Sequence, residues 1–336
     1  MKKLSVGNTL LFIINSIVAV VLLASYLNYF ISPIAFKYFA FLSLAVPALI
    51  LINMAFCIYW LLKFKKQFLL SFVTLAIGSF YLVKFYGFKE KQVIMGSDLK
   101  VMSYNVRLFN LYEWSEETDI PSKIYSFVDK KDPDILSVQE YATHNELEEN
   151  FKHKYIKWTS KTKKTGQAIF SKFPILKRGS LDFENSGNNA IFIDILKNED
   201  TLRIYNVHLE SLRLSKEETT LPGENSKTIE EKASHSFAKQ TEQTKLIIEH
   251  GNQTSHKSII TGDFNNNAFS WVYHQLNQGK NDAFQIAGEG FGKTFDYLYP
   301  LRIDFILVDE RIKINNFKTY SEKYSDHYPI MARIDF

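Results

Sequence analysis

The feature that most constrains this chain is a run of 24 residues, 8–31, that contains no charged side chain. Because an α-helix rises 1.5 Å per residue, a helix of this length crosses the hydrocarbon core of a bilayer, which is about 30 Å thick. Two more apolar runs follow at 38–62 and 67–85, of which the last is the shortest and contains Gly78. We therefore expect residues 1–96 to form a membrane region with three transmembrane helices.

A cleaved signal peptide is the alternative interpretation of the first run, since Lys2 and Lys3 precede it. However, the apolar core of such a peptide has only about 7–15 residues, and here two further apolar runs follow. We therefore favour membrane spans.

The lysines that flank the spans predict the orientation of the membrane region. Five of them lie before the first span or between the second and third, whereas only Lys37 lies between the first and second. Because lysines in short loops favour the cytoplasmic side, the N-terminus and the second loop are expected to be cytoplasmic. An odd number of spans then places residues 97–336 on the extracytoplasmic side. The five lysines are Lys2, Lys3, Lys63, Lys65 and Lys66.

Charge and cysteine content limit the chemistry of the second part of the chain. Residues 1–96 hold nine lysines and one acid, a charge of +8, whereas 97–336 hold 31 basic and 35 acidic residues, a charge of −4. The second part therefore lacks the bulk positive charge typical of tight nucleic-acid binders. The single cysteine, Cys57, excludes an intramolecular disulfide and a metal site built from several cysteines. Any metal has to use oxygen or imidazole ligands.

After Gly96, short β-branched and apolar runs alternate with polar helical stretches, which is typical of an α/β domain. The charged stretch 215–232 contains Pro222 and Gly223 and is expected to be a surface loop. Strands are expected at 100–106, 134–139, 167–171, 190–196, 202–208, 257–261, 303–308, 314–319 and 329–334, and helices at 120–130, 232–250 and 270–276.

Several of these strands end in a polar or titratable residue. Open α/β sheets bind ligands at the C-terminal ends of their strands, so we expect these side chains to form one site. Each of them alone also has a structural explanation, as a turn former, a cap or a solvated acid. Their number and order favour a functional site. The residues are Asn105, Glu140, His208, Asp263 and Asn265, together with Asp304 beside one strand and the tandem Asp326 and His327 before the last.

The motifs around these residues are SYNVR, SVQEY, GQAIFSKFPI, NVHLES, GDFN, RIDFILV and SDHYPI. In this order the set resembles the endonuclease/exonuclease/phosphatase superfamily, which includes DNase I, the exonuclease III-like enzymes, neutral sphingomyelinases and inositol polyphosphate 5-phosphatases. The resemblance covers 97–336. It implies an α/β fold for these residues, a four-layered αββα sandwich with two packed sheets that follows the transmembrane helical region.

The resemblance also implies a role for each residue. Asn105 and Glu140 are expected to bind the catalytic divalent ion, with Asp326 as a further or water-mediated ligand. The ion is expected to be Mg²⁺, with Mn²⁺ as a substitute, because the ligands are oxygens.

The remaining residues are expected to act on the phosphate and the attacking water. His327 is expected opposite the scissile phosphate, oriented by Asp304. Asp263 and Asn265 are expected to orient or deprotonate the water, and His208 to assist the leaving oxygen. The sequence leaves open whether Asp263 or His327 is the base.

We therefore expect a membrane-anchored, divalent-metal-dependent phosphoesterase that hydrolyses phosphodiester bonds, with a nuclease as the favoured form. A phospholipid or sphingomyelin phosphodiesterase and an inositol-phosphate phosphatase are the alternatives, and a non-catalytic membrane-tethered binding module is the alternative of another class. Lys161, Lys163 and Lys164 form a small basic cluster, which we interpret as a solvated loop. The sequence does not indicate an oligomeric state.

Overall fold

Two six-stranded mixed β-sheets dominate the computed structural model, which describes residues 4–88, 91, 93–160, 165–212, 226–297 and 299–336. In each sheet the two central strands are parallel and all other neighbours are antiparallel. The first sheet has the order β13 (Lys313–Thr319), β14 (Ile330–Asp335), β2 (Leu99–Asn105), β3 (Ile135–Ala142), β5 (Thr165–Ser171) and β4 (His153–Trp158). The second has the order β10 (Lys280–Asp282), β12 (Asp304–Asp309), β9 (Lys257–Asp263), β8 (Asp200–His208), β7 (Ala190–Lys197) and β6 (Ile175–Ser180).

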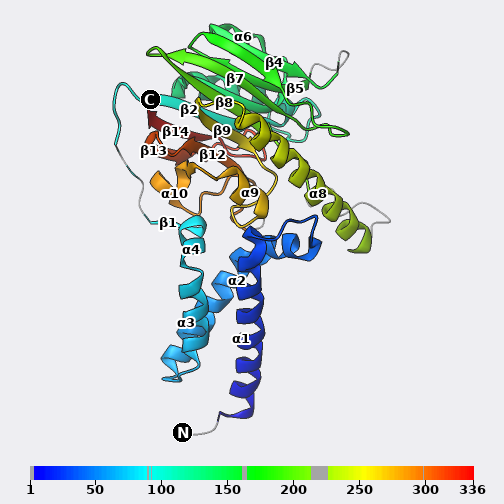
Figure 1. Cartoon of the computed structure of the whole chain (residues 1–336), viewed down its shortest axis with the longest axis vertical. Coiled ribbons are helices and arrows are strands. Elements are labelled where there is room, and N and C mark those ends of the chain that lie inside the picture. Colours follow the sequence, from blue (N-terminus) through cyan, green and yellow to red (C-terminus); the bar gives the residue numbers. More distant parts are fainter. Residues whose placement is uncertain (1–3, 89–90, 92, 161–164, 213–225, 298) are drawn as a thin grey trace.

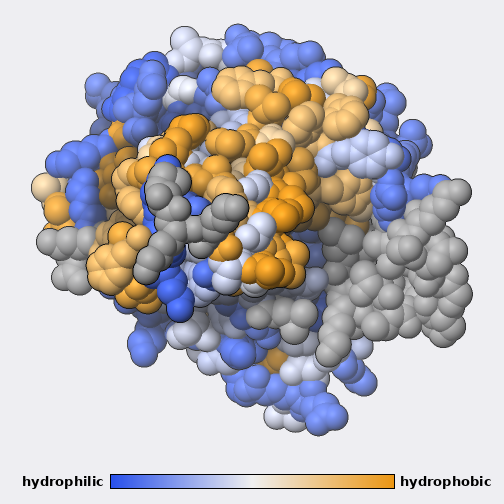
Figure 2. Space-filling view, turned by 90° about the horizontal axis from the view of Figure 1, so that it is seen from below, coloured by the Kyte–Doolittle hydropathy of each residue, from blue (hydrophilic) through white to orange (hydrophobic). Residues whose placement is uncertain are grey.

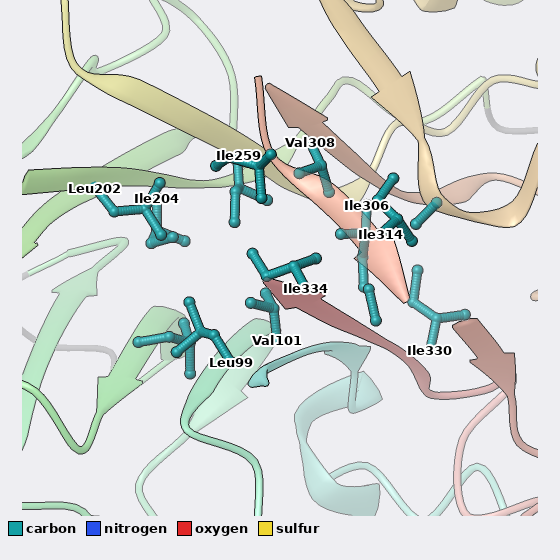
Figure 3. Packing of buried hydrophobic residues seen from close by; sticks show 14 of the residues in the cluster. Leu99, Val101, Leu202, Ile204, Ile259, Ile306, Val308, Ile314, Ile330 and Ile334 are labelled. Carbon is teal, nitrogen blue, oxygen red and sulfur yellow. The ribbon is translucent and has the colours of Figure 1, made fainter. Parts of the chain in front are cut away.

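The two sheets pack face to face through a core of branched aliphatic side chains (Figure 3). Along each strand alternate residues point inward, because successive side chains of a strand lie on opposite faces. Leu99 and Val101 of the first sheet meet Ile204 and Ile259 of the second, and all four are fully buried. Burial of such a side chain contributes about 1.5–3 kcal/mol to the stability of the fold.

Helices cover the outer face of each sheet (Figure 1). On the first sheet α5 (Ile120–Lys131) and α6 (Asn145–Asn150) contribute to an apolar cluster with β2, β3 and β5. On the second sheet α8 (Ser226–Gly251) and α9 (Trp271–Leu276) do the same with β7, β8 and β9. The expectation of a mixed α/β fold with two sheets is therefore confirmed. The smaller elements are η2 (Arg107–Asn110), α10 (Ala283–Ala287), and the short pair β1 (Gly87–Phe88) and β11 (Glu289–Gly290).

The N-terminal helices project from this body as α1 (Val6–Ser25), η1 (Tyr26–Tyr29), α2 (Lys37–Leu62), α3 (Phe68–Ile77) and α4 (Ser79–Phe85) (Figure 1). Two helical segments, Val6–Tyr29 with 24 residues and Lys37–Leu62 with 26, are long and apolar enough to cross a membrane. Many large apolar side chains on these helices are exposed, and hydrophobic residues gather at this end of the molecule (Figure 2).

The expected single helix over 67–85 is wrong in detail. The chain forms α3 and α4 instead, and their axes are bent by 75° at Gly78. The Tyr26 ring packs against this glycine so closely that a Cβ there would lie 2.0 Å from the tyrosine oxygen, and the hydroxyl donates to the Thr74 carbonyl at 3.0 Å. The break therefore lies where an aromatic side chain of η1 occupies the space that a longer side chain would need.

The N-terminal helices dock on one loop of the second sheet, 264–270, which follows β9. Tyr29 donates its hydroxyl hydrogen to the Ala268 carbonyl at 3.0 Å, and Asn267 Nδ2 donates to the Ser43 carbonyl of α2 at 2.9 Å. The Phe269 ring stacks on the Tyr81 ring of α4 with centroids 5.4 Å apart. Three membrane-region segments thus contact the same loop.

Most expected elements are confirmed within a few residues, but three edge strands, β4, β6 and β10, and the short helices α6 and α10 were not expected. The expected loop at 215–232 is wrong over its last part, because α8 begins at Ser226. Residues 213–225, and with them Pro222 and Gly223, lie outside the described residues, as do Lys161, Lys163 and Lys164.

Candidate active site

Asn105 and Glu140 meet at the C-terminal ends of β2 and β3. Asn105 is almost fully buried as the last residue of β2. In β3 a bulge places two residues, Gln139 and Glu140, opposite the single Gln167 of β5, and Glu140 adopts the left-handed region with a φ of 47°. Bulges of this kind re-aim one side chain. The Glu140 carboxylate here lies 3.3 Å from Asn105 Nδ2.

The second sheet brings three more expected residues together through strand register. His208 ends β8 beside Asp263, the last residue of the parallel strand β9, and Asp304 of β12 pairs with Asp263 from the other side. A Cβ on Gly262, whose φ is 132°, would lie 1.9 Å from the Val207 carbonyl oxygen. Glycine is therefore required before Asp263, because β8 and β9 approach each other closely here.

The Asp263 carboxylate is the centre of the site. Its Oδ2 accepts a hydrogen bond from Asn105 Nδ2 at 3.1 Å and lies 3.6 Å from Nε2 of both His208 and His327. Burial raises the pKa of Asp263 to about 6, against the opposing charge of His327, and the neighbouring Asp304 adds to the rise. A carboxylate that is ionised at neutral pH with a pKa this close to it is suited to accept a proton.

The two histidines differ in protonation. Burial lowers the pKa of His208, so that its imidazole is neutral at pH 7. His327 Nδ1 donates to Asp304 Oδ2 at 2.9 Å. Burial alone would lower the pKa of His327, but Asp304 and Asp263 together outweigh it and raise this pKa to about 10. His327 is therefore a buried imidazolium at neutral pH, held between two carboxylates.

Asn265 orients Asp263 through the backbone. Its N–H donates to Asp263 Oδ1 at 2.8 Å, and its side-chain Nδ2 donates to the Leu209 carbonyl at 2.9 Å. The residue has a φ of 49°, a conformation that asparagine tolerates better than most residues. Each oxygen of the Asp263 carboxylate thus accepts a hydrogen bond, Oδ1 from the Asn265 N–H and Oδ2 from Asn105 Nδ2.

Asp326 lies at the rim of the site. Its Oδ2 lies 3.2 Å from Arg107 Nη1. Between Asp326 and the centre, Ser325 Oγ donates to the Asn105 carbonyl at 2.8 Å and accepts from the His327 N–H at 3.2 Å. Ser325 therefore ties the loop that carries His327 to the end of β2.

Arg107 stands in an unusual turn. The four residues of η2 have φ values of 43°, 54°, 54° and 63°, which is one turn in the left-handed region. This conformation costs L-residues roughly 1–2 kcal/mol each. The guanidinium carbon of Arg107 also lies 4.7 Å from the centre of the Trp114 ring. The strained turn thus holds the positively charged guanidinium of Arg107 at the rim of the site.

A cavity of about 740 Å³ opens beside this centre, between the ends of the two sheets. Glu140 and His208 line it on the side of the catalytic groups, and Trp158 and Lys157 of β4 line it farther out. Gln167 also lines this cavity, and its side-chain amide is buried without a hydrogen-bond partner among the described residues. The cavity is large enough for part of an organic substrate.

The donors at this edge fit a divalent cation. Burial raises the pKa of the Glu140 carboxyl. The charge of His327 opposes this rise and the charge of Asp326 adds to it. A cation beside Glu140 would therefore stabilise its carboxylate form. Carboxylate and amide oxygens are the ligands that Mg²⁺ and Mn²⁺ prefer. Within the described part of the chain, Asp263, Asp304 and His327 also offer ligand atoms within 4.8 Å of one another. In this group, His327 and Asp304 already bond each other.

Seven of the eight expected site residues lie together around Asp263. The eighth, Asp326, lies at the rim of the site and pairs with Arg107. Sequence reasoning missed Arg107, Ser325 and Gln167. Arg107 and Ser325 stand within the motifs SYNVR and SDHYPI, and Gln167 within GQAIFSKFPI, so their positions were visible but their contacts were not.

Comparison with known proteins gives two family matches. Residues 102–327 match the endonuclease/exonuclease/phosphatase family, and residues 8–85 match a domain of unknown function, DUF8431. A search of curated proteins finds no match to this chain.

Solved structures share the two-sheet fold at low sequence identity. The human Nocturnin catalytic domain with bound sulfate is 16% identical with a TM-score of 0.56, covering 73% of this chain and 95% of its own. D. rerio TDP2 in complex with a single-strand DNA product is 16% identical with a TM-score of 0.53, covering 71% and 100%. An endonuclease/exonuclease/phosphatase from Bacteroides vulgatus is 16% identical with a TM-score of 0.54, covering 71% and 98%.

Proposed function

The chain belongs to the endonuclease/exonuclease/phosphatase family and is a phosphoester-hydrolysing enzyme, and from that premise we propose that it is a membrane-anchored, Mg²⁺-dependent nuclease. Members of this family typically use divalent metals, and membership sets aside a non-catalytic binding module. The observation that carries the proposal is the convergence of two imidazoles and one amide on a single buried carboxylate oxygen, Asp263 Oδ2.

The roles follow from the protonation states. Asp263, with a pKa of about 6, takes the proton of the attacking water, and Asn265 holds the carboxylate in place. The His327 imidazolium offers positive charge to a phosphate oxygen, supported by Asp304. Neutral His208 lies on the cavity side, where its imidazole N–H can donate a hydrogen bond to the leaving oxygen, which takes up its proton from water.

Glu140 and Asn105 would hold the metal, with Asp326 at its edge. We propose Mg²⁺, with Mn²⁺ as a substitute, because the donors are oxygens. A divalent cation held there supplies positive charge to the phosphate oxygens during displacement.

The proposed membrane topology has three crossings, with the catalytic part extracytoplasmic. What supports it is the path of the chain: α1 rises to the catalytic body, α2 leads away from it, and α3 with α4 returns to it (Figure 1). The loop between α2 and α3, which holds Lys63, Lys65 and Lys66, lies at the same far end as the start of α1 (Figure 1), which agrees with the preference of lysines for the cytoplasmic side.

A lipid phosphodiesterase is the second candidate, because the catalytic loop touches the membrane helices. Asn267, two residues beyond Asn265, donates to the Ser43 carbonyl in the second turn of α2. A substrate embedded in the bilayer would therefore lie close to the site. Nucleic acid remains the favoured substrate, since a related fold is solved with a single-strand DNA product.

The full chain in detergent micelles tests the proposal. Hydrolysis of a labelled single-stranded oligonucleotide, of bis(p-nitrophenyl) phosphate, and of vesicles that contain sphingomyelin or phosphoinositides is measured with Mg²⁺ and with EDTA. We expect cleavage of the oligonucleotide that EDTA abolishes and Mg²⁺ restores. Asp263→Asn and His327→Ala are each expected to lower kcat by about 10³-fold, roughly 4 kcal/mol in the barrier.

His256→Ala is the matched control, because this histidine is exposed and lies before β9, at the strand end opposite to the site. It is expected to keep the wild-type rate. Turnover of the vesicles without cleavage of the oligonucleotide would replace the nuclease by the lipid enzyme, and full activity of both site variants would refute the assignment of the site.

A further inference from the structure

A groove with a basic lining lies at the other end of strand β4 from the catalytic cavity. Its volume is about 560 Å³, and of the seven residues that line it four are lysine or arginine, one is histidine and none is acidic; one of the four, Lys154, is paired with Glu148 at 3.0 Å. The other three, Lys152, Lys177 and Arg178, are exposed. The five basic residues of this β4–β6 groove are Lys152, His153, Lys154, Lys177 and Arg178.

The groove joins the two edge strands of the sandwich. Residues 152–154 stand at the start of β4, the edge of the first sheet, and 175–178 form β6, the edge of the second. Because some twenty residues separate the two segments, neither forms a charge run in the sequence. The average charge of −4 over 97–336 therefore concealed a local concentration of positive charge.

Strand β4 links the groove to the catalytic cavity. The groove contains His153 at one end of this strand, and the cavity contains Trp158 at the other. At about 3.3 Å per residue the two residues lie roughly 17 Å apart. Between them, Lys157 Nζ lies 2.6 Å from a carboxylate oxygen of Asp182. Asp182 lines the cavity together with Glu140, and this ion pair neutralises its charge.

Aromatic side chains accompany the basic ones. The guanidinium carbon of Arg178 lies 5.7 Å from the centre of the Tyr155 ring. Trp158 is half-buried in the lining of the cavity. A positive groove with aromatic rings beside it is typical of proteins that bind single-stranded nucleic acids, because phosphates meet the charges and bases stack on the rings.

We propose that the β4–β6 groove binds the phosphate backbone of a single-stranded nucleic acid whose scissile bond lies at Asp263 and His327. The proposal rests on the proposed nuclease function and deepens it. A strand that reaches from the cavity to the groove has to cover roughly 17 Å. The enzyme therefore discriminates in favour of strands longer than this.

A second basic hollow supplies a matched control. It has a volume of about 670 Å³, is lined by Lys130, Lys131, Lys318 and Arg333 among others, and shares no residue with the catalytic cavity. Removal of three positive charges there changes the net charge of the protein by the same amount as removal of three from the β4–β6 groove.

The test compares two triple variants of the full chain in detergent. The groove variant carries Lys152→Gln, Lys177→Gln and Arg178→Gln, and the control variant carries Lys130→Gln, Lys318→Gln and Arg333→Gln. We measure kcat/KM for a 20-nucleotide single-stranded DNA and for bis(p-nitrophenyl) phosphate, at several salt concentrations. Anisotropy of the labelled DNA in an Asp263→Asn background with EDTA reports binding without cleavage.

The groove variant is expected to lose at least tenfold in kcat/KM and in affinity for the DNA and to keep its rate on the small diester. Because each phosphate contact contributes about 0.7 to the salt slope for single strands, the slope is expected to fall by about 2. The control variant is expected to behave as wild type on both substrates.

Equal losses in both variants, or an unchanged groove variant, would overturn the groove assignment while the nuclease proposal stands. A wild-type protein that hydrolyses the small diester but neither cuts nor binds the DNA would refute both.

Discussion

His327 is held between two buried carboxylates, and their charge decides its protonation state. Because Asp304 contributes most to the raised pKa of His327, Asp304→Asn is expected to lower this pKa. Activity that requires the imidazolium is lost as pH rises through the pKa of His327, about 10 in the wild type. The alkaline limb of kcat is therefore expected to move to lower pH in Asp304→Asn, and a pH–rate profile measures it. An alkaline limb at an unchanged pH would exclude His327 as its origin.

Asp263 governs the acid side of the same profile. Its pKa is raised to about 6, so the carboxylate binds a proton, and loses its capacity as a base, as pH falls through that value. Wild-type activity is expected to fall about tenfold for each unit below pH 6. A profile that stays flat down to pH 4.5 would contradict Asp263 as the base.

Gln167 allows a prediction about stability. A buried amide without a partner costs about 1–3 kcal/mol, and methionine has a similar volume without the polar atoms. Gln167→Met is therefore expected to raise the free energy of unfolding by about 1 kcal/mol, measured by thermal or denaturant unfolding of the full chain. A lower stability would mean that a bound water or ion satisfies this amide.

At this scale the sequence predicted which residues form the site, because each stands at the end of an apolar run within a recognisable motif. It did not predict how they pair. The bulge at Glu140 and the left-handed turn at Arg107 depend on long-range packing that overrides local backbone preference. The bond from Ser325 to the Asn105 carbonyl joins residues at opposite ends of the domain.

At the scale of elements, the close approach of β8 and β9 holds the histidine and the aspartate of the site in register. Gly262→Ala would place a Cβ 1.9 Å from the Val207 carbonyl, a contact that only separation of the two strands relieves. We expect a loss of stability of more than about 3 kcal/mol together with loss of activity. Gly96→Ala, where a Cβ meets nothing within 4 Å, is the control. Normal unfolding of the Gly262 variant would show that the strands separate at little cost.

The sequence predicted all the central strands and the edge strand β13, but it missed the edge strands β4, β6 and β10. Central strands are covered on both faces and read as continuous apolar runs, as in β7 and β9. The edge strands β4 and β6 lie partly in solvent, and lysines interrupt their apolar residues. Charged side chains on edge strands also prevent pairing with other chains, so the missing hydrophobic signal has a function of its own.

At the scale of the whole molecule, the N-terminal helices help to support the loop 264–270 that follows Asp263. Removal of residues 1–86 would strip Phe269 of its stacking partner Tyr81 and Asn267 of the Ser43 carbonyl. A truncated chain of 87–336 is expected to unfold at a temperature several degrees lower and to have a lower kcat than the full chain. Calorimetry and the oligonucleotide assay on both proteins measure this.

An equal transition temperature and an equal rate in the two proteins would show that the helices contribute neither to the stability nor to the activity of the rest of the chain. The sequence could predict the helices from their hydrophobicity alone. It could not predict their docking, which depends on a few polar contacts and one ring stack between distant segments.

The strand order has a consequence for the synthesis of the protein. Asn105 lies on β2, and β14, which pairs with β2, follows His327 at the far end of the domain. A ribosome therefore has to make every residue from Asn105 to β14 before β2 gains its second neighbour, and every residue up to His327 before the site is complete. Since domains fold as units during translation, the nascent chain cannot assemble the site until nearly the whole domain has been made.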